Sequence, residues 1–213
     1  MTCIVGVVDK GKVYIGGDSA GVSGLNISIR KDPKVFKVKE FVIGCTSSFR
    51  MIQLLNFSFK PPVIKKDRDL YEYMCTDFVD AVRKCFQKGG YLQKHKDGDE
   101  MGGTFLIGIR GRLFMIENDF QVAENHVPFD SVGCGEPFAK AALHALHGFD
   151  IAPEEKIKRV LDIFIQREAV DGENLMTDKW KGLKRILMIG ILFPLDIRKQ
   201  KLLLIILIVF VSS

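Results

Sequence analysis

The chain of 213 residues has the length of one domain, or of one domain with an additional segment. Its 47% hydrophobic and 27% charged residues are an ordinary globular composition, which excludes a disordered tail, a collagenous fibre and a coiled coil. The 31 basic and 26 acidic residues are spread along the sequence and leave a net charge of +5, so nothing favours nucleic acid as a partner. The 5 cysteines form no C-x-x-C pair, which argues against a disulfide framework or a zinc site and favours a reducing compartment.

Strands and tight turns are predicted for the part of the chain up to Cys45. Short runs of apolar and β-branched residues predict strands over 2–8, 12–15, 34–38 and 41–44. Asp9-Lys10-Gly11 marks a hairpin turn between the first two strands. A loop containing Gly21 and Gly24 is expected after the second.

Helices and further strands follow. Ser47 or Ser48 can cap a helix that runs through Leu55, and a longer helix is predicted from about 70 to 87. Strands are expected at 104–109, 113–117 and 131–133, and helices at about 137–147 and 153–167. This order of strands, helices, strands and helices predicts a layered α+β domain rather than alternating βαβ units.

Neither end of the sequence predicts a membrane span. The charges of Asp9 and Lys10 interrupt the first apolar run before it is long enough for a secretory signal. Residues 202–211 read LLLIILIVFV, which is shorter than the roughly 20 residues of a spanning helix. We therefore expect a buried strand or an apolar tail there, no spanning segment, and a cytoplasmic location.

Thr2 is the most informative residue of the sequence. Methionine aminopeptidases remove an initiator Met that precedes a small residue, which would leave Thr2 with a hydroxyl and a free α-amine. Such an amine has a reference pKa of about 7.7–8.0, so near neutral pH it can accept the proton of the hydroxyl. A threonine in this position can therefore act as a nucleophile that is activated by its own amine.

Two charged residues stand at spacings that would support this chemistry. Asp18 ends a Gly16-Gly17-Asp18 motif after one predicted strand, and Lys34 opens another. A buried lysine beside the terminal amine would lower the pKa of that amine by like-charge repulsion and would stabilise a developing alkoxide. A carboxylate such as Asp18 would keep the lysine ionised and oriented.

The segments TCIVGVVDKGKVYIGGDSA, KVFKV and FVIGCTSS resemble proteasome β-type peptidases, and most closely the HslV-type bacterial subunits and their small proteasome-like relatives. The resemblance implies that Thr2 is the nucleophile, Asp18 the lysine-orienting aspartate and Lys34 the catalytic lysine. It also implies that Gly44 supplies an oxyanion-hole N–H, since a glycine lets the substrate backbone approach closely.

Cys134 departs from the family pattern. Its segment, SVGCGEPFA, is similar to a G-S-G turn of the family in which a serine hydrogen-bonds near the terminal amine. A thiol is a weaker donor and acceptor, so proton transfer through this position would be poorer or would fall to water. Two alternatives stay open: Cys134 as a nucleophile at a helix N-terminus, or Cys3 as a nucleophile after loss of both preceding residues. His144 and His147 have the spacing of a metal pair, but without a third ligand we expect two surface histidines.

The resemblance covers about 2–170, and Asp171 loosely matches a later turn that supports the amine in the family. We expect a proteasome-like domain over 1–172 and a divergent C-terminal segment over 173–213. The implied fold is a four-layer αββα sandwich, that of the N-terminal-nucleophile (Ntn) hydrolases.

The implied function is that of a threonine-type endopeptidase, which needs no metal and no organic cofactor. Its substrate would be a peptide or an unfolded protein. The family also implies a homo-oligomeric ring, in some cases fed by an ATP-driven unfoldase. The alternative is a proteasome-like structural subunit that assembles but does not cleave, which the cysteine at position 134 and the unmatched C-terminus favour slightly.

Overall fold

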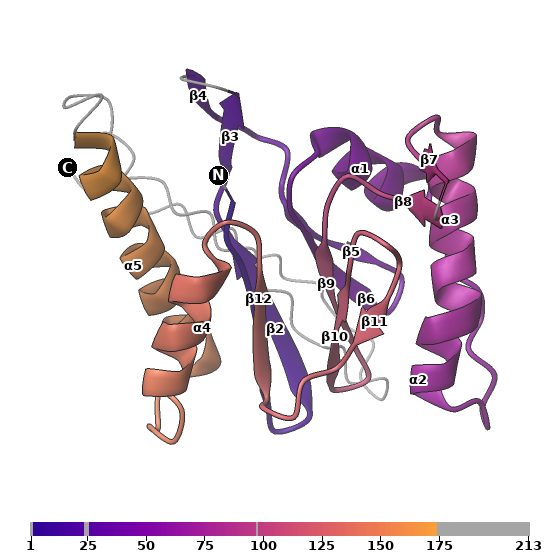
Figure 1. Cartoon of the computed structure of the whole chain (residues 1–213). Helices are drawn as coiled ribbons and strands as arrows, with labels where there is room; N and C mark the ends of the chain where they lie inside the picture. Colours follow the sequence, from indigo (N-terminus) through magenta and orange to yellow (C-terminus); the bar gives the residue numbers. More distant parts are fainter. Residues whose placement is uncertain (1, 24–25, 97, 174–213) are drawn as a thin grey trace.

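The computed structural model of the chain describes residues 2–23, 26–96 and 98–173. Within them, two antiparallel sheets face each other, and helices cover both outer faces (Figure 1). The expected mixed α+β architecture is confirmed.

The first sheet carries the N-terminal end of the chain. Its strands stand in the order β12 (Phe129–Val132), β1 (Ile4–Asp9) and β2 (Lys12–Gly17). The β1–β2 hairpin closes through Lys10 and Gly11, which have φ angles of 47° and 71°. Two positive φ angles in a two-residue turn match the right-handed twist of the strands, and they explain the predicted turn.

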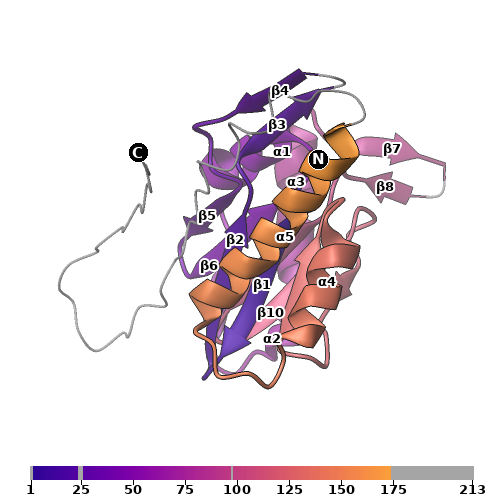
Figure 2. The same cartoon turned by 90° about the vertical axis from the view of Figure 1, so that its left-hand side faces the viewer.

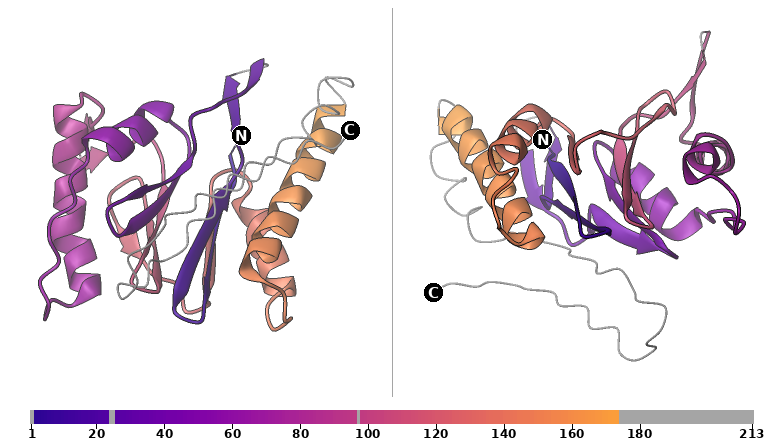
Figure 3. Two further views of the ribbon diagram at one scale, coloured as in Figure 1. Left: turned by 180° about the vertical axis from the view of Figure 1, so that it is seen from behind. Right: turned by 90° about the horizontal axis from the view of Figure 1, so that it is seen from below.

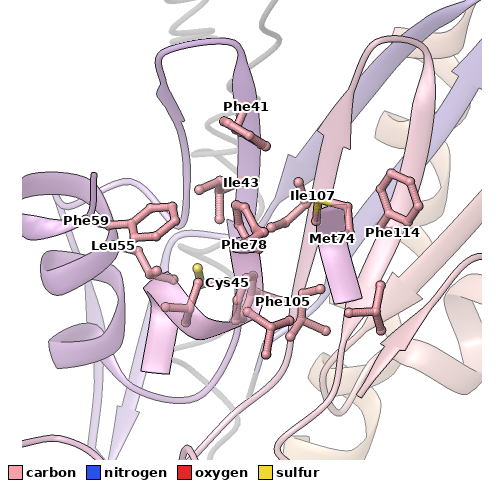
Figure 4. Packing of buried hydrophobic residues seen from close by; sticks show 14 of the residues in the cluster. Phe41, Ile43, Cys45, Leu55, Phe59, Met74, Phe78, Phe105, Ile107 and Phe114 are labelled. Carbon is pink, nitrogen blue, oxygen red and sulfur yellow. The ribbon is translucent and has the colours of Figure 1, made fainter. Parts of the chain in front are cut away.

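The second sheet has five strands, in the order β11 (Val122–Ala123), β10 (Arg112–Ile116), β9 (Phe105–Ile109), β6 (Phe41–Cys45) and β5 (Val35–Val38). Its outer face packs on α1 (Phe49–Gln53) with the π-helical turn η1 (Leu54–Ser58), and on the continuous helix made of α2 (Leu70–Tyr73), η2 (Met74–Phe78) and α3 (Val79–Lys88). Figure 4 shows the apolar core of this layer, which includes Phe41, Phe78 and Phe105; the ring centroids of Phe41 and Phe78 are 5.2 Å apart.

Helices α4 (Glu136–Ala145) and α5 (Pro153–Glu173) lie along the outer face of the first sheet (Figure 2). Alternation along β1 explains the layering: Val5 and Val7 point to these helices, whereas Ile4 points to the second sheet. The views from behind and from below show the same succession of layers (Figure 3).

Two small hairpins were not predicted. β3 (Ala20–Ser23) pairs with β4 (Asn26–Ile29) where a loop was expected, and β7 (Gln93–His95) pairs with β8 (Gly98–Glu100) in a polar stretch. Within the described residues, no helix is both long enough and apolar enough to cross a membrane. The apolar run 202–211, and with it nearly all of the predicted segment 173–213, lies outside them.

Candidate active site

Thr2 lies two residues before the start of β1 and is 7% exposed. The turn after β12 holds it in place. The carbonyl of Thr2 accepts a hydrogen bond from the N–H of Gly135 at 3.2 Å. Gly133 has a φ of 102°, and a Cβ there would lie 2.4 Å from the Thr2 oxygen, so only a glycine fits behind the residue.

The structure brings Thr2, Asp18 and Lys34 together. Lys34 Nζ donates to Thr2 Oγ1 at 2.9 Å and to Asp18 Oδ2 at 2.7 Å. The side chains of Lys34 and Asp18 are only 3% and 7% exposed. Asp18 Oδ1 accepts from the N–H of Cys3 at 2.8 Å, and Oδ2 accepts from Ala20 at 2.9 Å. The buried ion pair is therefore well hydrogen-bonded, which is the condition under which such a pair is tolerated.

The two glycines before Asp18 allow this convergence. A Cβ on Gly16 would lie 2.5 Å from Ile157 Cγ2 of α5, and one on Gly17 would lie 2.4 Å from Ile4 Cδ1. Both faces of β2 are thus packed too closely for a side chain at its end. Gly16 thus lets α5 lie close to the end of β2, and Gly17 leaves room for the side chain of Ile4 on the paired strand, so that Asp18 follows directly at the position where it meets Lys34.

Cys134 stands at the amine side of Thr2. The Thr2 nitrogen donates to Cys134 Sγ at 3.3 Å, the contact expected of the family's serine. Cys134 is exposed, whereas Cys3 is fully buried and burial raises its pKa to about 12. The thiol of Cys3 therefore stays protonated, which argues against the alternative in which Cys3 is the nucleophile.

Gly44 lies apart from this cluster. It occupies the middle strand β6, paired with Val35 on one side and Leu106 on the other, so its N–H points within the sheet at a neighbouring strand. A Cβ there would lie 2.6 Å from Ile4 Cγ2 and 2.7 Å from Ile15 Cγ2. The glycine lets the two sheets pack closely, and this placement does not support the predicted oxyanion role.

An open cleft of about 320 Å³ leads to Thr2 and Cys134. One wall is the β3–β4 hairpin, and another includes the turn at Thr46 and Ser47. Ser47 has a φ of 62°, which is unusual for a residue with a side chain, and the N–H of Ser48 closes the turn onto the carbonyl of Thr46 at 2.9 Å.

The sequence-based predictions missed this wall. The only early sign of the hairpin was a short alternation in Ile27 and Ile29, and Ser47 was read only as a helix cap. The cap itself is Ser48, whose hydroxyl accepts from the N–H of Arg50.

The remaining candidates lie elsewhere. His144 and His147 flank the ring of Phe129 at 4.9 Å and 5.6 Å between ring centroids. Within the described residues, no group of three or more His, Cys, Asp or Glu could hold a metal ion. Asp171 lies in the part of α5 whose side chains fall outside the description.

Comparison with solved structures finds proteins with a similar fold. Thiobacillus denitrificans BPH in complex with epoxomicin is 18% identical, with a TM-score of 0.63 over 79% of this chain and 90% of that one. HslV from Trypanosoma brucei is 16% identical, with a TM-score of 0.54 over 78% of this chain and 91% of that one. Anbu from Pseudomonas aeruginosa, solved as a helical assembly, is 14% identical, with a TM-score of 0.56 over 91% of this chain and 80% of that one.

No family model matches the sequence, and no curated protein matches it. At such low identities the likeness concerns the fold, and it agrees with the resemblance that the sequence motifs suggested. The chain thus has the fold of the proteasome-like N-terminal-nucleophile hydrolases.

Proposed function

We propose that this chain is a threonine-type endopeptidase in which Thr2 becomes the N-terminal nucleophile once Met1 is removed. The observation that carries the proposal is the hydrogen bond from Lys34 Nζ to Thr2 Oγ1, made by a lysine that is buried and paired with Asp18. We also propose that the layers form the four-layer αββα sandwich of Ntn hydrolases, with the catalytic domain over 1–172.

In the proposed reaction, Thr2 Oγ1 attacks the carbonyl carbon of a peptide bond, and the hydroxyl proton moves to the freed α-amine. The amine then gives this proton to the leaving nitrogen as the C–N bond breaks. Water hydrolyses the resulting ester. The positive charge of Lys34 stabilises the alkoxide, and Asp18 fixes the lysine in place. These steps use only groups of the protein and water.

The backbone amide that meets the oxyanion is proposed to be that of Ser47 rather than that of Gly44, because the amides of Thr46 and Ser48 donate to other carbonyls. Ser47 lines the cleft that leads to Thr2, whereas Gly44 is enclosed between the sheets. Cys134 would orient the α-amine through the contact that it makes with the Thr2 nitrogen.

The test combines the intact mass of the purified protein with hydrolysis of fluorogenic peptides. We expect the mass to show loss of one methionine, and Thr2→Ala to lower kcat/KM by several orders of magnitude while the fold is kept. Cys134→Ser should retain activity, because a hydroxyl can take over the contact with the amine. Activity that survives Thr2→Ala but is lost in Cys134→Ala would make the thiol the nucleophile.

A second readout uses the inhibitor held by the similar Thiobacillus protein. We expect epoxomicin to bind the native chain and to fail with Thr2→Ala, as followed by intact mass. A retained methionine together with no hydrolysis would favour the alternative, a structural subunit that assembles without cleaving. Size-exclusion chromatography with light scattering would test the proposed homo-oligomer in either case.

A further inference from the structure

The cleft above Thr2 has a single charged wall residue. Among the described residues that line it, Arg30 is the only one with a charged side chain; the others are apolar, hydroxyl, amide or thiol residues. Lys34 lies beneath Thr2 and is engaged by both Thr2 and Asp18. The charge that a bound peptide meets along this wall is therefore that of Arg30.

Two contacts orient the guanidinium of Arg30. Its Nε and Nη2 both donate to Asp32 Oδ2, the former at 3.1 Å. Its central carbon lies 4.0 Å from the centroid of the Phe49 ring, another residue of the cleft wall. Ion pairing on one edge and stacking on one face hold the plane of the group in a fixed direction.

Gly21 provides the room for this side chain. A Cβ on Gly21 would lie 2.9 Å from Arg30 Cδ and 3.2 Å from Cγ, so the stem of Arg30 crosses the hairpin where β3 has no side chain. Within the described residues, the hydrogen bonds of the guanidinium both go to Asp32 and neither uses Nη1. The group thus keeps donors for a further acceptor.

We propose that Arg30 makes the enzyme select peptides that place a glutamate or aspartate side chain in this cleft, near the bond that Thr2 attacks. The inference rests on the proposed peptidase function. A carboxylate matches the geometry because a guanidinium donates to it through parallel N–H bonds. Asp32 does not cancel the effect, since it engages one edge of the group and is itself 42% exposed, where water screens its charge.

The experiment compares one fluorogenic peptide in versions that carry Glu, Gln, Leu or Lys at each position around the cleaved bond. For at least one position we expect kcat/KM for Glu to exceed that for Gln on the order of tenfold, the effect of one charge-assisted contact, and to fall with added salt. Arg30→Gln should bring the ratio of kcat/KM for Glu to that for Gln to about one. Arg30→Glu should make kcat/KM for the Lys peptide higher than that for the Glu peptide.

Arg159→Gln is the matched control. Arg159 is also a half-exposed guanidinium paired with an acid, Glu155, but it lies on α5. Its variant should keep the ratio of the native protein. A carboxylate could come from the Glu side chain or from the C-terminus of the peptide, and peptides with a free or an amidated C-terminus separate these two sources. We expect the preference for Glu over Gln to be the same in both kinds of peptide.

Two outcomes would overturn the inference: equal rates for Glu and Gln in the native protein, or an unchanged ratio in Arg30→Gln. If no peptide is hydrolysed, the proposed function fails, and binding still decides the role of Arg30. Labelled Glu and Gln peptides are then compared by fluorescence anisotropy. Tighter binding of the Glu peptide that is lost in Arg30→Gln supports the inference, and equal binding rejects it.

Discussion

Lys34 and Asp18 are buried together, and each is the ionic partner of the other. Asp18 accepts hydrogen bonds from two backbone amides besides the lysine, while Lys34 uses one donor for the carboxylate and another for Thr2. Removing one member of such a pair leaves a charge without its partner in a site that excludes water. Both single changes therefore disturb the same arrangement around Thr2 Oγ1.

We expect Lys34→Ala and Asp18→Ala each to lower kcat/KM at least about a hundredfold, and the double variant to lose little more than the worse single one. Lys34→Arg should also fail, because a planar guanidinium does not fit a site shaped for an ammonium. The measurement is a double-mutant cycle on peptide hydrolysis.

Lys140→Ala is the control for this cycle. Lys140 pairs with the buried carboxylate of Asp130 at 3.0 Å, away from the residues that line the cleft. Its loss should lower stability and leave hydrolysis unchanged. Additive losses at Lys34 and Asp18 would contradict their action as one unit.

The buried thiol of Cys3 makes the stability of the fold depend on pH in the alkaline range. Burial raises its pKa from 9.0 to about 12, so between these values the unfolded chain holds a thiolate while the folded chain holds a thiol. The contribution of Cys3 to stability is complete below pH 9 and declines as the pH rises towards 12, by up to about 1.4 kcal/mol per pH unit. The free energies of unfolding of the native protein and of Cys3→Ala, measured with urea, should therefore approach each other from pH 8 to pH 11.

The comparison with a buried residue that cannot ionise checks this reasoning. Ile43→Val removes one buried methylene group and no titratable group, so its effect on the unfolding free energy should not change over the same pH range. A constant difference between native protein and Cys3→Ala would show that the thiol ionises in the folded state as it does in the unfolded one.

The spacing of residues in the sequence was sufficient to predict one part of the site, the cluster of Thr2, Asp18 and Lys34. Thr2 and Asp18 flank the paired strands β1 and β2, so regular strand pairing brings these two together, and the packing of the second sheet on the first adds Lys34, which precedes β5. A glycine that permits substrate approach and one that permits sheet packing look alike in a sequence, so only the structure could place Gly44 between the two sheets. Arg30 was missed because its direction depends on Phe49 and Gly21, and no local pattern reports such contacts.

Elements with a strong apolar period were predicted well. The helix expected over about 70–87 is continuous from α2 to α3, although the π-helical turn η2 in its middle carries no sequence signal that we can identify. The hairpins β3–β4 and β7–β8 escaped prediction because their strands have three or four residues and few apolar side chains.

The close contact between the sheets makes a prediction about β6. Gly44→Ala should destabilise the chain by about 1–3 kcal/mol, because its methyl group would overlap Ile4 and Ile15. Urea unfolding measures the loss. Adding Ile15→Ala should cost less than the two separate changes together, since the new methyl group fills part of the space that Ile15 leaves. An unchanged unfolding midpoint in Gly44→Ala would contradict the packing role.

At the scale of the whole molecule, the two sheets differ in size. Within the described residues, the first sheet has three strands, and β12 at its edge is buried along its whole length on both faces. An edge strand with unpaired backbone groups is a site of aggregation unless the protein covers it. Truncation tests whether the edge of β12 needs residues 174–213.

We expect a chain that ends at Glu173 to aggregate, while the full chain stays dispersed. The reason is the edge of β12, and the measurement is size-exclusion chromatography with light scattering on both forms. The shorter chain keeps α5, whose residues pack in the core of the first layer. A dispersed and cooperatively folding 1–173 chain would show that the last residues are dispensable.

The burial of Thr2 also sets an order of events during synthesis. Thr2 is 7% exposed because β1 lies between β2 and β12, and an aminopeptidase must enclose the terminus whose bond it cuts. The pairing of β1 with β12 cannot begin before the ribosome has passed Val132. At about 5–20 residues per second this leaves on the order of ten seconds. If Met1 is removed as proposed, the removal must come before this pairing, and a chain that folds first would keep Met1 and lack the free α-amine that the proposed reaction needs.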